Sequence, residues 1–287
     1  DRSVSRGLGD VYKRQILLLI AVTVNVVFFL YDNKPVMDED IINKENVAHE
    51  TYIKNYHEEV NAIIDNADKL KKYSIFNKAG SFSYANILQT ARDFERVKNV
   101  ILPEDEYKGV QAYTTYYYQY FFTMLVMMFV IYDMFAQRDN GMWSITYSCA
   151  NGRIMYAIKQ TGVIVVTGAF THTLIYWSTF IAAMLQRGGV RDLVNPVQTI
   201  ETFDKFTYPW SKIKYVTVLY LISMVCIVAL CITIWGVFVM FRNRVYALVT
   251  MLIFAAVEQF IYSHIDIHSV WTVSYTHLRA HETLSDL

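Results

Sequence analysis

Apolar and polar stretches alternate along the chain, and five of the apolar stretches are candidates for membrane spans. They cover residues 16–31, 113–136, 158–185, 215–241 and 245–262. A helix needs about 20 mainly apolar residues to cross the hydrocarbon layer of roughly 30 Å, and the first stretch lies near the short limit. The pattern therefore predicts an all-α, polytopic transmembrane helix bundle with five visible spans. A cleaved signal peptide is the alternative for residues 16–31, but no small-residue cleavage site follows them.

The region between the first two spans, residues 32–112, is polar and carries charges of both signs. Apolar residues within it recur at intervals of three and four, which is typical of amphipathic helices. One series is Ile53, Tyr56, Val60, Ile63, Ala67 and Leu70, and the other is Ile87, Leu88, Ala91, Phe94, Val97 and Ile101. We expect two helices, separated by a break at residues 77–81 and with the second stopped by Pro103. Because two helices bury little apolar surface, they should dock on each other and on the spans or a second subunit.

Residues 137–159 form the longest polar-containing break among the hydrophobic segments of the second half of the chain. Between the bracketing Gly141 and Gly152, serine, threonine and asparagine surround the apolar residues Met142, Trp143, Ile145, Tyr147 and Ala150. That composition suits a short helix that lies at the membrane surface. A short interfacial helix between two spans is a place where a soluble partner can push on a membrane protein.

Composition supports a membrane protein and argues against a nucleic-acid-binding surface, a disulfide framework and a zinc site. Of all residues, 54% are apolar and 15% are aromatic, while the formal net charge is zero. A nucleic-acid-binding surface would need an excess of basic residues, which this chain lacks. The three cysteines, Cys149, Cys226 and Cys231, lie in or beside membrane segments and have neither a disulfide nor a zinc spacing. We interpret them as small buried hydrophobes.

Both ends of the chain look foreign to the rest. Residues 10–15, Asp-Val-Tyr-Lys-Arg-Gln, and residues 273–283, Val-Ser-Tyr-Thr-His-Leu-Arg-Ala-His-Glu-Thr, resemble translations of the two arms of a transposase adaptor used for sequencing libraries. We therefore expect residues 1–15 and 272–287 to be non-native tails. The native protein would then be truncated at both ends, and we expect at least one further span, six in all, in the intact protein.

No familiar enzyme motif occurs in the sequence. The chain has no Walker-type glycine-rich loop, no His-Glu-x-x-His, no Gly-x-Ser-x-Gly and no Cys-x-x-Cys. Residues 263–268, Ser-His-Ile-Asp-Ile-His, could supply metal ligands, but their position just beyond a span favours a hydrated interfacial loop. We expect a chain without catalytic residues, without a metal site and without a cofactor of its own.

Four polar residues within the predicted spans are candidates for a translocation path: Asn25, His172, Glu258 and Gln259. Glu258 lies about fourteen residues past Arg244, which is about 20 Å at helical rise. A lone carboxylate inside the hydrocarbon is costly and suggests a function. The alternative is that Glu258 caps or breaks its helix near the outer interface. For Asn25 and His172 the alternative is hydrogen bonding between helices, which is the more frequent role of such residues.

The layout of the spans, with a short interfacial helix between the second and third, resembles the permease subunits of bacterial ABC-type exporters of the type-2 (type V fold) family. In that family a segment begins near a Glu, has Gly four residues on, and continues to an Arg and then to a Lys that opens the third span. Gly141, Arg153 and Lys159 fit this pattern. Gln137 stands where the family usually has Glu, which argues against a salt bridge from this position to the ATPase. The loop at residues 195–200 and the hairpin Arg242-Asn243-Arg244 are also similar, and the likeness covers about residues 16–269.

The resemblance implies a multi-pass protein of the cell membrane with its N-terminus inside, residues 32–112 outside, and residues 137–159 as a cytoplasmic coupling helix. It also implies a separate ATPase subunit that binds ATP and Mg²⁺, and a dimer of permease halves, either a homodimer or a heterodimer. Closure of the ATPase would push the coupling helix and rock the spans, so that the pathway opens outward. The residues that the resemblance places in ATPase coupling are Gln137, Arg138, Gly141, Met142, Trp143, Tyr147, Arg153 and Lys159.

Two other functions remain open on the sequence alone. A membrane-embedded sensor or accessory protein would bind a ligand outside the cell with residues 32–112. An intramembrane enzyme would use Glu258 with His264 or Asp266.

Positive charge does not orient the chain in the membrane, because the short loops on the two sides are equally basic. One side has Arg138, Arg153, Lys159, Arg242 and Arg244, and the other has Arg187, Arg191, Lys205, Lys212 and Lys214.

Overall fold

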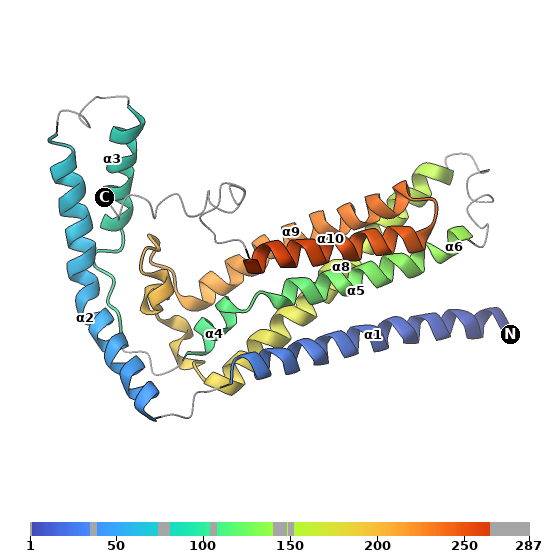
Figure 1. Ribbon diagram of the computed structural model, residues 1–287, viewed down its shortest axis with the longest axis horizontal. Coiled ribbons are helices and arrows are strands. Elements are labelled where there is room, and N and C mark those ends of the chain that lie inside the picture. The colour runs from blue at the N-terminus through green and yellow to red at the C-terminus, as the bar shows by residue number, and fades with distance from the viewer. Residues whose placement is uncertain are drawn as a thin grey trace. The chain divides into compact units, whose positions relative to one another are not determined.

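The computed structural model of the chain describes residues 2–34, 39–73, 81–103, 108–139, 148 and 152–264 (Figure 1). The α-helices are α1 (Arg2–Asp32), α2 (Glu39–Leu70), α3 (Phe82–Glu95), α4 (Gly109–Thr115), α5 (Tyr118–Met134), α6 (Ala136–Asp139), α8 (Gly152–Arg187), α9 (Lys212–Met240) and α10 (Arg244–His264). Short 3₁₀ helices are η1 (Arg191–Val194), η2 (Val197–Thr199) and η3 (Glu201–Phe203). All regular elements of the described residues are helices, which confirms the predicted all-α class.

Three helices in the described part of the chain are long and apolar enough to cross a membrane: the Arg14–Asp32 part of α1, α8 and α9. Helix α5 and the Arg244–Val257 part of α10 are apolar but shorter. The five predicted spans thus correspond to three helices of spanning length and two shorter apolar helices. Of the three long helices, α8 is the most buried and α1 the least, so α1 exposes most of its apolar side chains.

The predicted second span, residues 113–136, is not one continuous helix. Tyr116 and Tyr117 leave the helical path, and they separate α4 from α5. Tyr116 is only 3% exposed, and its hydroxyl lies 3.0 Å from the side-chain oxygen of Asn25 in α1. Tyrosine is a moderate helix former, so burial of the ring and pairing of its hydroxyl can outweigh the lost helical hydrogen bonds. Sequence periodicity does not reveal a break of this kind, because its cause lies in another helix.

The chain divides into two compact units. The bundle unit comprises residues 1–28, 116–179 and 221–287, and the insert unit comprises residues 29–115 and 180–220. The insert unit therefore combines most of the polar region between the first two predicted spans with the connection between α8 and α9. Residues far apart in the sequence build each unit, so neither could have been delimited as a simple segment.

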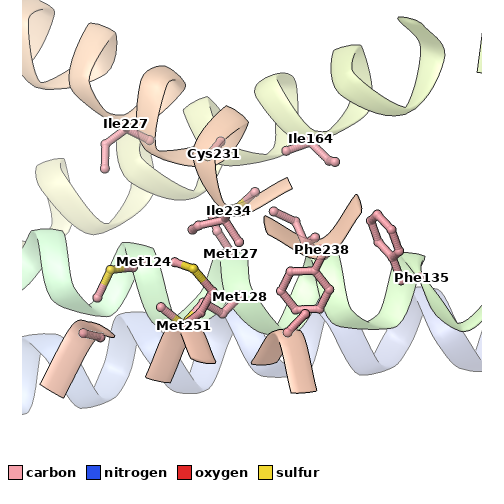
Figure 2. Close-up of a cluster of buried hydrophobic side chains, with 13 residues drawn as sticks. Met124, Met127, Met128, Phe135, Ile164, Ile227, Cys231, Ile234, Phe238 and Met251 are labelled. Carbon is pink, nitrogen blue, oxygen red and sulfur yellow. The ribbon is translucent and has the colours of Figure 1, made fainter. Parts of the chain in front are cut away.

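The core of the bundle unit is a cluster of buried side chains from α5, α8, α9 and α10 (Figure 2). Its members are Met124, Met127, Met128, Ile131, Phe135, Ile164, Ile227, Cys231, Ile234, Phe238, Ala247, Met251 and Ala255. Between membrane helices, close packing of such side chains supplies the attraction, because lipid is as apolar as the core. Unbranched methionine side chains, four of which lie in this cluster, adapt to irregular gaps between helices.

In the insert unit, helices α2 and α3 pack side by side (Figure 1). Tyr56 and Val60 of α2 are buried against Phe94, Val97 and Leu102, and a second cluster joins Ala67 to Ile87 and Ala91. All of these residues except Leu102 belong to the predicted three-and-four series, and the contacts confirm two amphipathic helices that dock on each other. The start of α3 is capped by Ser81, whose hydroxyl accepts from the backbone N–H of Tyr84 at 3.3 Å.

The predicted end of the second amphipathic helix is wrong. Helix α3 ends at Glu95, well before Pro103, and the chain continues in tight turns with hydrogen bonds from Val97 to Phe94 and from Val100 to Val97. Outside the helix, a spacing of three or four residues no longer marks one face. Ile101 is consequently 81% exposed, whereas Leu102 takes the buried position.

The connection between α8 and α9 is the second part of the insert unit. It begins at Gly188 and Gly189, whose φ angles of 70° and 107° belong to the left-handed region that glycine adopts without strain. The 3₁₀ helices follow, and Pro196 pairs with Ser211 in an isolated β-bridge. The Tyr52 hydroxyl of α2 donates to the carbonyl of Gln198 at 2.7 Å. The amphipathic helices therefore dock on this connection, a partner that the sequence analysis did not name.

Candidate functional site

Arg138 of α6 joins two segments of the bundle unit that lie far apart in the sequence. Its guanidinium donates to the carbonyl of Phe238 at 3.2 Å and to the carbonyl of Phe241 at 2.8 Å. These carbonyls stand at the C-terminal end of α9, where backbone acceptors lack intrahelical donors and the helix dipole is negative. The guanidinium also lies 5.0 Å from the ring centre of Phe135. Arg138 thus caps α9 from the beginning of the connection between α5 and α8.

The turn between α9 and α10 is also held at the start of α10, by Asn243 and Arg244. The Asn243 side-chain oxygen accepts from the backbone N–H of Val245 at 2.8 Å and so caps the start of α10. The guanidinium of Arg244 lies 4.6 Å from the ring centre of Tyr132 in α5. The predicted tight turn at Arg242-Asn243-Arg244 is confirmed, since α9 ends at Met240 and α10 begins at Arg244.

These contacts place α6, where the connection between α5 and α8 begins, at the same end of the bundle unit as the turn between α9 and α10 (Figure 1). We call this end, with Tyr132, Phe135, Arg138, Phe238, Phe241 and Arg244, the polar end.

The residues predicted to couple to an ATPase are distributed over three parts of the chain. Gln137 and Arg138 belong to α6. Arg153 and Lys159 are exposed residues of the first turns of α8. Gly141, Met142, Trp143 and Tyr147 lie outside the described residues. The structure brings Arg138 to the end of α9, a contact that the sequence could not reveal.

Asn25 of α1 is a fully buried polar residue of the bundle unit. Its amide nitrogen donates to the Thr179 hydroxyl of α8 at 2.7 Å, and its side-chain oxygen accepts from the Tyr116 hydroxyl at 3.0 Å. The Thr179 hydroxyl in turn donates to the backbone carbonyl of Ile175 at 2.7 Å. Asn25 therefore ties α1 to two other parts of the bundle unit, as polar residues between membrane helices commonly do.

His172 of α8 is likewise fully buried in the bundle unit. Its Nε2 atom lies 2.8 Å from the Ser223 hydroxyl of α9, and its ring stacks on Tyr120 with a centroid distance of 5.8 Å. The ring of Tyr176 also lies against the His172 ring, at a centroid distance of 5.6 Å. His172 thus joins α5, α8 and α9 through one polar and several aromatic contacts.

Of the four candidates for a translocation path, Asn25 and His172 have these defined partners on neighbouring helices. Glu258 and Gln259 belong to α10, but their side chains lie outside what the structure describes. Sequence reasoning missed the partners Tyr116, Thr179 and Ser223. Serine and threonine in membrane helices commonly bond to their own backbone, so their presence in a span does not predict a contact with another helix.

Replacing Asn25 with leucine is expected to lower the free energy of unfolding by about 1 kcal/mol, because its side-chain hydrogen bonds to Thr179 of α8 and to Tyr116 are lost. The cost stays moderate because the Tyr116 hydroxyl lies 3.2 Å from the Asn25 backbone carbonyl and can still donate to it. Thermal unfolding in detergent would measure the change. Thr23→Val is the matched control, since the exposed Thr23 hydroxyl bonds only to Leu19 of its own helix. Equal unfolding temperatures for the two variants would contradict the role of Asn25.

Contacts within the insert unit hold α2 against the connection between α8 and α9. Besides the Tyr52 bond to Gln198, His49 Nδ1 lies 3.8 Å from Glu201 Oε1, and the Arg96 guanidinium lies 5.3 Å from the ring centre of Tyr208. Burial and the nearby Tyr56, Asp204 and glutamates raise the pKa of the Tyr52 phenol. This phenol therefore keeps its proton at physiological pH and donates to the carbonyl throughout that range.

Titratable side chains give no indication of a metal centre in the part of the chain that the structure describes. Among those residues, no group of three or more His, Cys, Asp or Glu is arranged to hold an ion. His264, the last described residue of α10, belongs to the predicted interfacial segment, whose Asp266 and His268 lie outside the described residues.

Family models, curated proteins and solved structures were all compared with the chain, and none matches it.

Proposed function

We propose that this chain is the membrane-spanning permease subunit of an ATP-driven ABC exporter of the type-2 (type V fold) family. The observation that carries the proposal is the polar end of the bundle unit. There α6, at the start of the predicted coupling segment 137–159, is attached through Arg138 to the end of α9 and the turn that follows it. A partner that presses on residues 137–159 would therefore act on several helices at once.

In this proposal five spans are present, formed by α1, α5, α8, α9 and α10, and a sixth belongs to the intact protein. Helices α8 and α9 are long enough to cross the bilayer, so their two ends face opposite sides. The polar end faces the cytoplasm. The amphipathic helices and the connection between α8 and α9 face outward together, which is supported by the bond from Tyr52 to Gln198.

The mechanism needs no covalent chemistry in this chain. A separate ATPase subunit binds ATP and Mg²⁺, and its closure presses on residues 137–159, where Met142, Trp143 and Tyr147 supply apolar anchors. Helices of two permease subunits then rock between an inward-facing and an outward-facing arrangement. Glu258 and Gln259 are the candidates for contact with the cargo, while Asn25 and His172 hold helices together through the bonds described above.

Purification of the intact protein from its native membranes in mild detergent tests the proposal. We expect a stoichiometric partner that cross-links to 8-azido-ATP, and we expect Trp143→Ala to release most of it by removing an apolar anchor. Trp210→Ala is the matched control, because Trp210 lies in the connection between α8 and α9 and should leave the partner bound. Absence of any ATP-binding partner from the unmodified protein would refute the proposed function.

A membrane-embedded sensor is the second candidate function. The observation in its favour is the insert unit, which has hydrophobic clusters of its own around Tyr56 and Ala67. A sensor would purify without an ATPase, and its ligand would protect α2 and α3 from hydrogen exchange. The purification described above therefore separates the two candidates.

A further inference from the structure

We propose that Arg138 is the positioning residue that carries movement of residues 137–159 into the helical hairpin formed by α9 and α10. The inference rests on the proposed function, because it assumes that an ATPase moves residues 137–159. It goes further in naming the atoms through which that movement reaches the bundle unit: the guanidinium of Arg138 and the carbonyls of Phe238 and Phe241.

The geometry favours Arg138 because it stands at the junction between the two moving parts. It lies in α6, immediately after Gln137, where the connection begins. Its two acceptors lie on either side of Met240, the last residue of α9. Displacement of α6 therefore pulls directly on the backbone of α9, and no flexible side chain of α9 lies between them.

The chemistry of the contact suits the transmission of force. Hydrogen bonds from a charged donor are stronger than neutral ones. Both carbonyls accept from the Nη1 atom, whose two N–H bonds point in fixed directions because the guanidinium is planar. The acceptors stand at the negative end of a helix dipole, which a cation stabilises. The half-buried side chain also packs against Phe135, so water competes less for its donors.

Arg244 completes the attachment of the hairpin. Its guanidinium lies 4.6 Å from the ring centre of Tyr132, so α10 is held to α5 just before α6 begins. The end of α9 and the start of α10 are thus attached to the same stretch of chain. A shift of that stretch would move the hairpin as a body, and would not simply bend the turn between its helices.

A purely structural cap on α9 is the competing explanation, and a conformational readout separates the two. Cysteines introduced at Ser148 and at Val245 report on the two moving parts, because both positions are exposed. The purified complex with its ATPase is labelled with a water-soluble maleimide, with and without Mg·ATP and orthovanadate. Labelling of the native cysteines is measured in the protein without an introduced cysteine and is subtracted. In the otherwise unmodified complex, we expect nucleotide to change both labelling rates by about fivefold or more.

The Arg138→Met variant is purified together with the ATPase, and its nucleotide response at Ser148→Cys is measured first. Loss of the ATPase or of that response would show that Arg138 acts at the partner interface itself, and would overturn the inference. The variant's response at Val245→Cys should fall to within about twofold of the nucleotide-free rate, because the link to α9 is lost. Arg242→Met is the matched control. It removes a positive charge from the exposed residue that follows Phe241 in the sequence, and it should leave both responses unchanged.

Should Arg138→Met fail to fold, Arg138→Lys provides the same test. The lysine side chain is shorter and its ammonium rotates freely, so it cannot hold the two carbonyls in the directions that the planar Nη1 group fixes. At least half of the response at Val245→Cys should therefore disappear. A full response at Val245→Cys in either folded variant would overturn the inference and leave the proposed function intact. If the unmodified protein has no ATPase partner, the proposed function and this inference fail together.

Discussion

Replacing Gly109 with alanine is expected to destabilise the protein by about 3 kcal/mol, because a side chain at this position has no room. A Cβ atom there would lie 2.2 Å from the backbone oxygen of Gly188 and 2.7 Å from the terminal methyl of Met184. The methionine can move, but the Gly188 oxygen belongs to the backbone that ends α8. Gly188 itself has a φ angle of 70°, which restricts any local adjustment. Thermal unfolding in detergent and the yield of folded protein would measure the effect.

Gly162→Ala is the matched control for this prediction. Gly162 lies in α8, and a Cβ atom built there would have no neighbour within 4 Å. Alanine at that position should be neutral or should stabilise the helix by up to about 1 kcal/mol, because glycine is the poorer helix former. If both alanine variants unfold at the same temperature, the close approach of α4 to the end of α8 does not exist in the protein.

Sequence periodicity predicted burial well wherever a helix is regular. Tyr56, Val60, Ala67, Ile87 and Ala91 were assigned to buried faces, and the structure buries all of them. Such positions follow from one repeating geometry, so a pattern of apolar residues is enough to find them. The prediction failed where tertiary contacts end or interrupt a helix. The break at Tyr116 and the early end of α3 are the two examples.

The candidate site was predictable only in part, and the reason is chemical. Asn25 and His172 stood out because polar residues are expensive within apolar spans. Arg138 was included through a family resemblance, but its partners are backbone carbonyls of α9. Every residue has a carbonyl, so no sequence pattern marks the particular ones that an arginine will cap. The contact between Arg138 and the end of α9 is therefore visible only in the folded structure.

Gly168 permits a second close approach, this time between α8 and α9 in the bundle unit. A Cβ atom at this position would lie 2.5 Å from Cys231 Sγ, and the next nearest atoms, both of Met127, would be at 3.4 and 3.7 Å. Gly168→Ala should therefore cost about 2 kcal/mol, because a buried sulfur must move in a packed core. The short side chain of cysteine gives it few alternative positions within the cluster drawn in Figure 2.

Cys231→Ala should rescue the Gly168→Ala variant, because it removes the only atom closer than 3.4 Å to the new methyl group. We expect the double variant to unfold at a higher temperature than Gly168→Ala alone, with a coupling of about 1 kcal/mol or more between the two sites. Cys226→Ala is the control. The prediction that Cys226 is buried is wrong, since it is exposed on the same helix, where it cannot relieve the clash. Equal rescue by Cys226→Ala, or strict additivity with Cys231→Ala, would show that α8 and α9 do not meet at Gly168. That result would remove the packing contact by which α9 and α8 could move together when residues 137–159 are displaced.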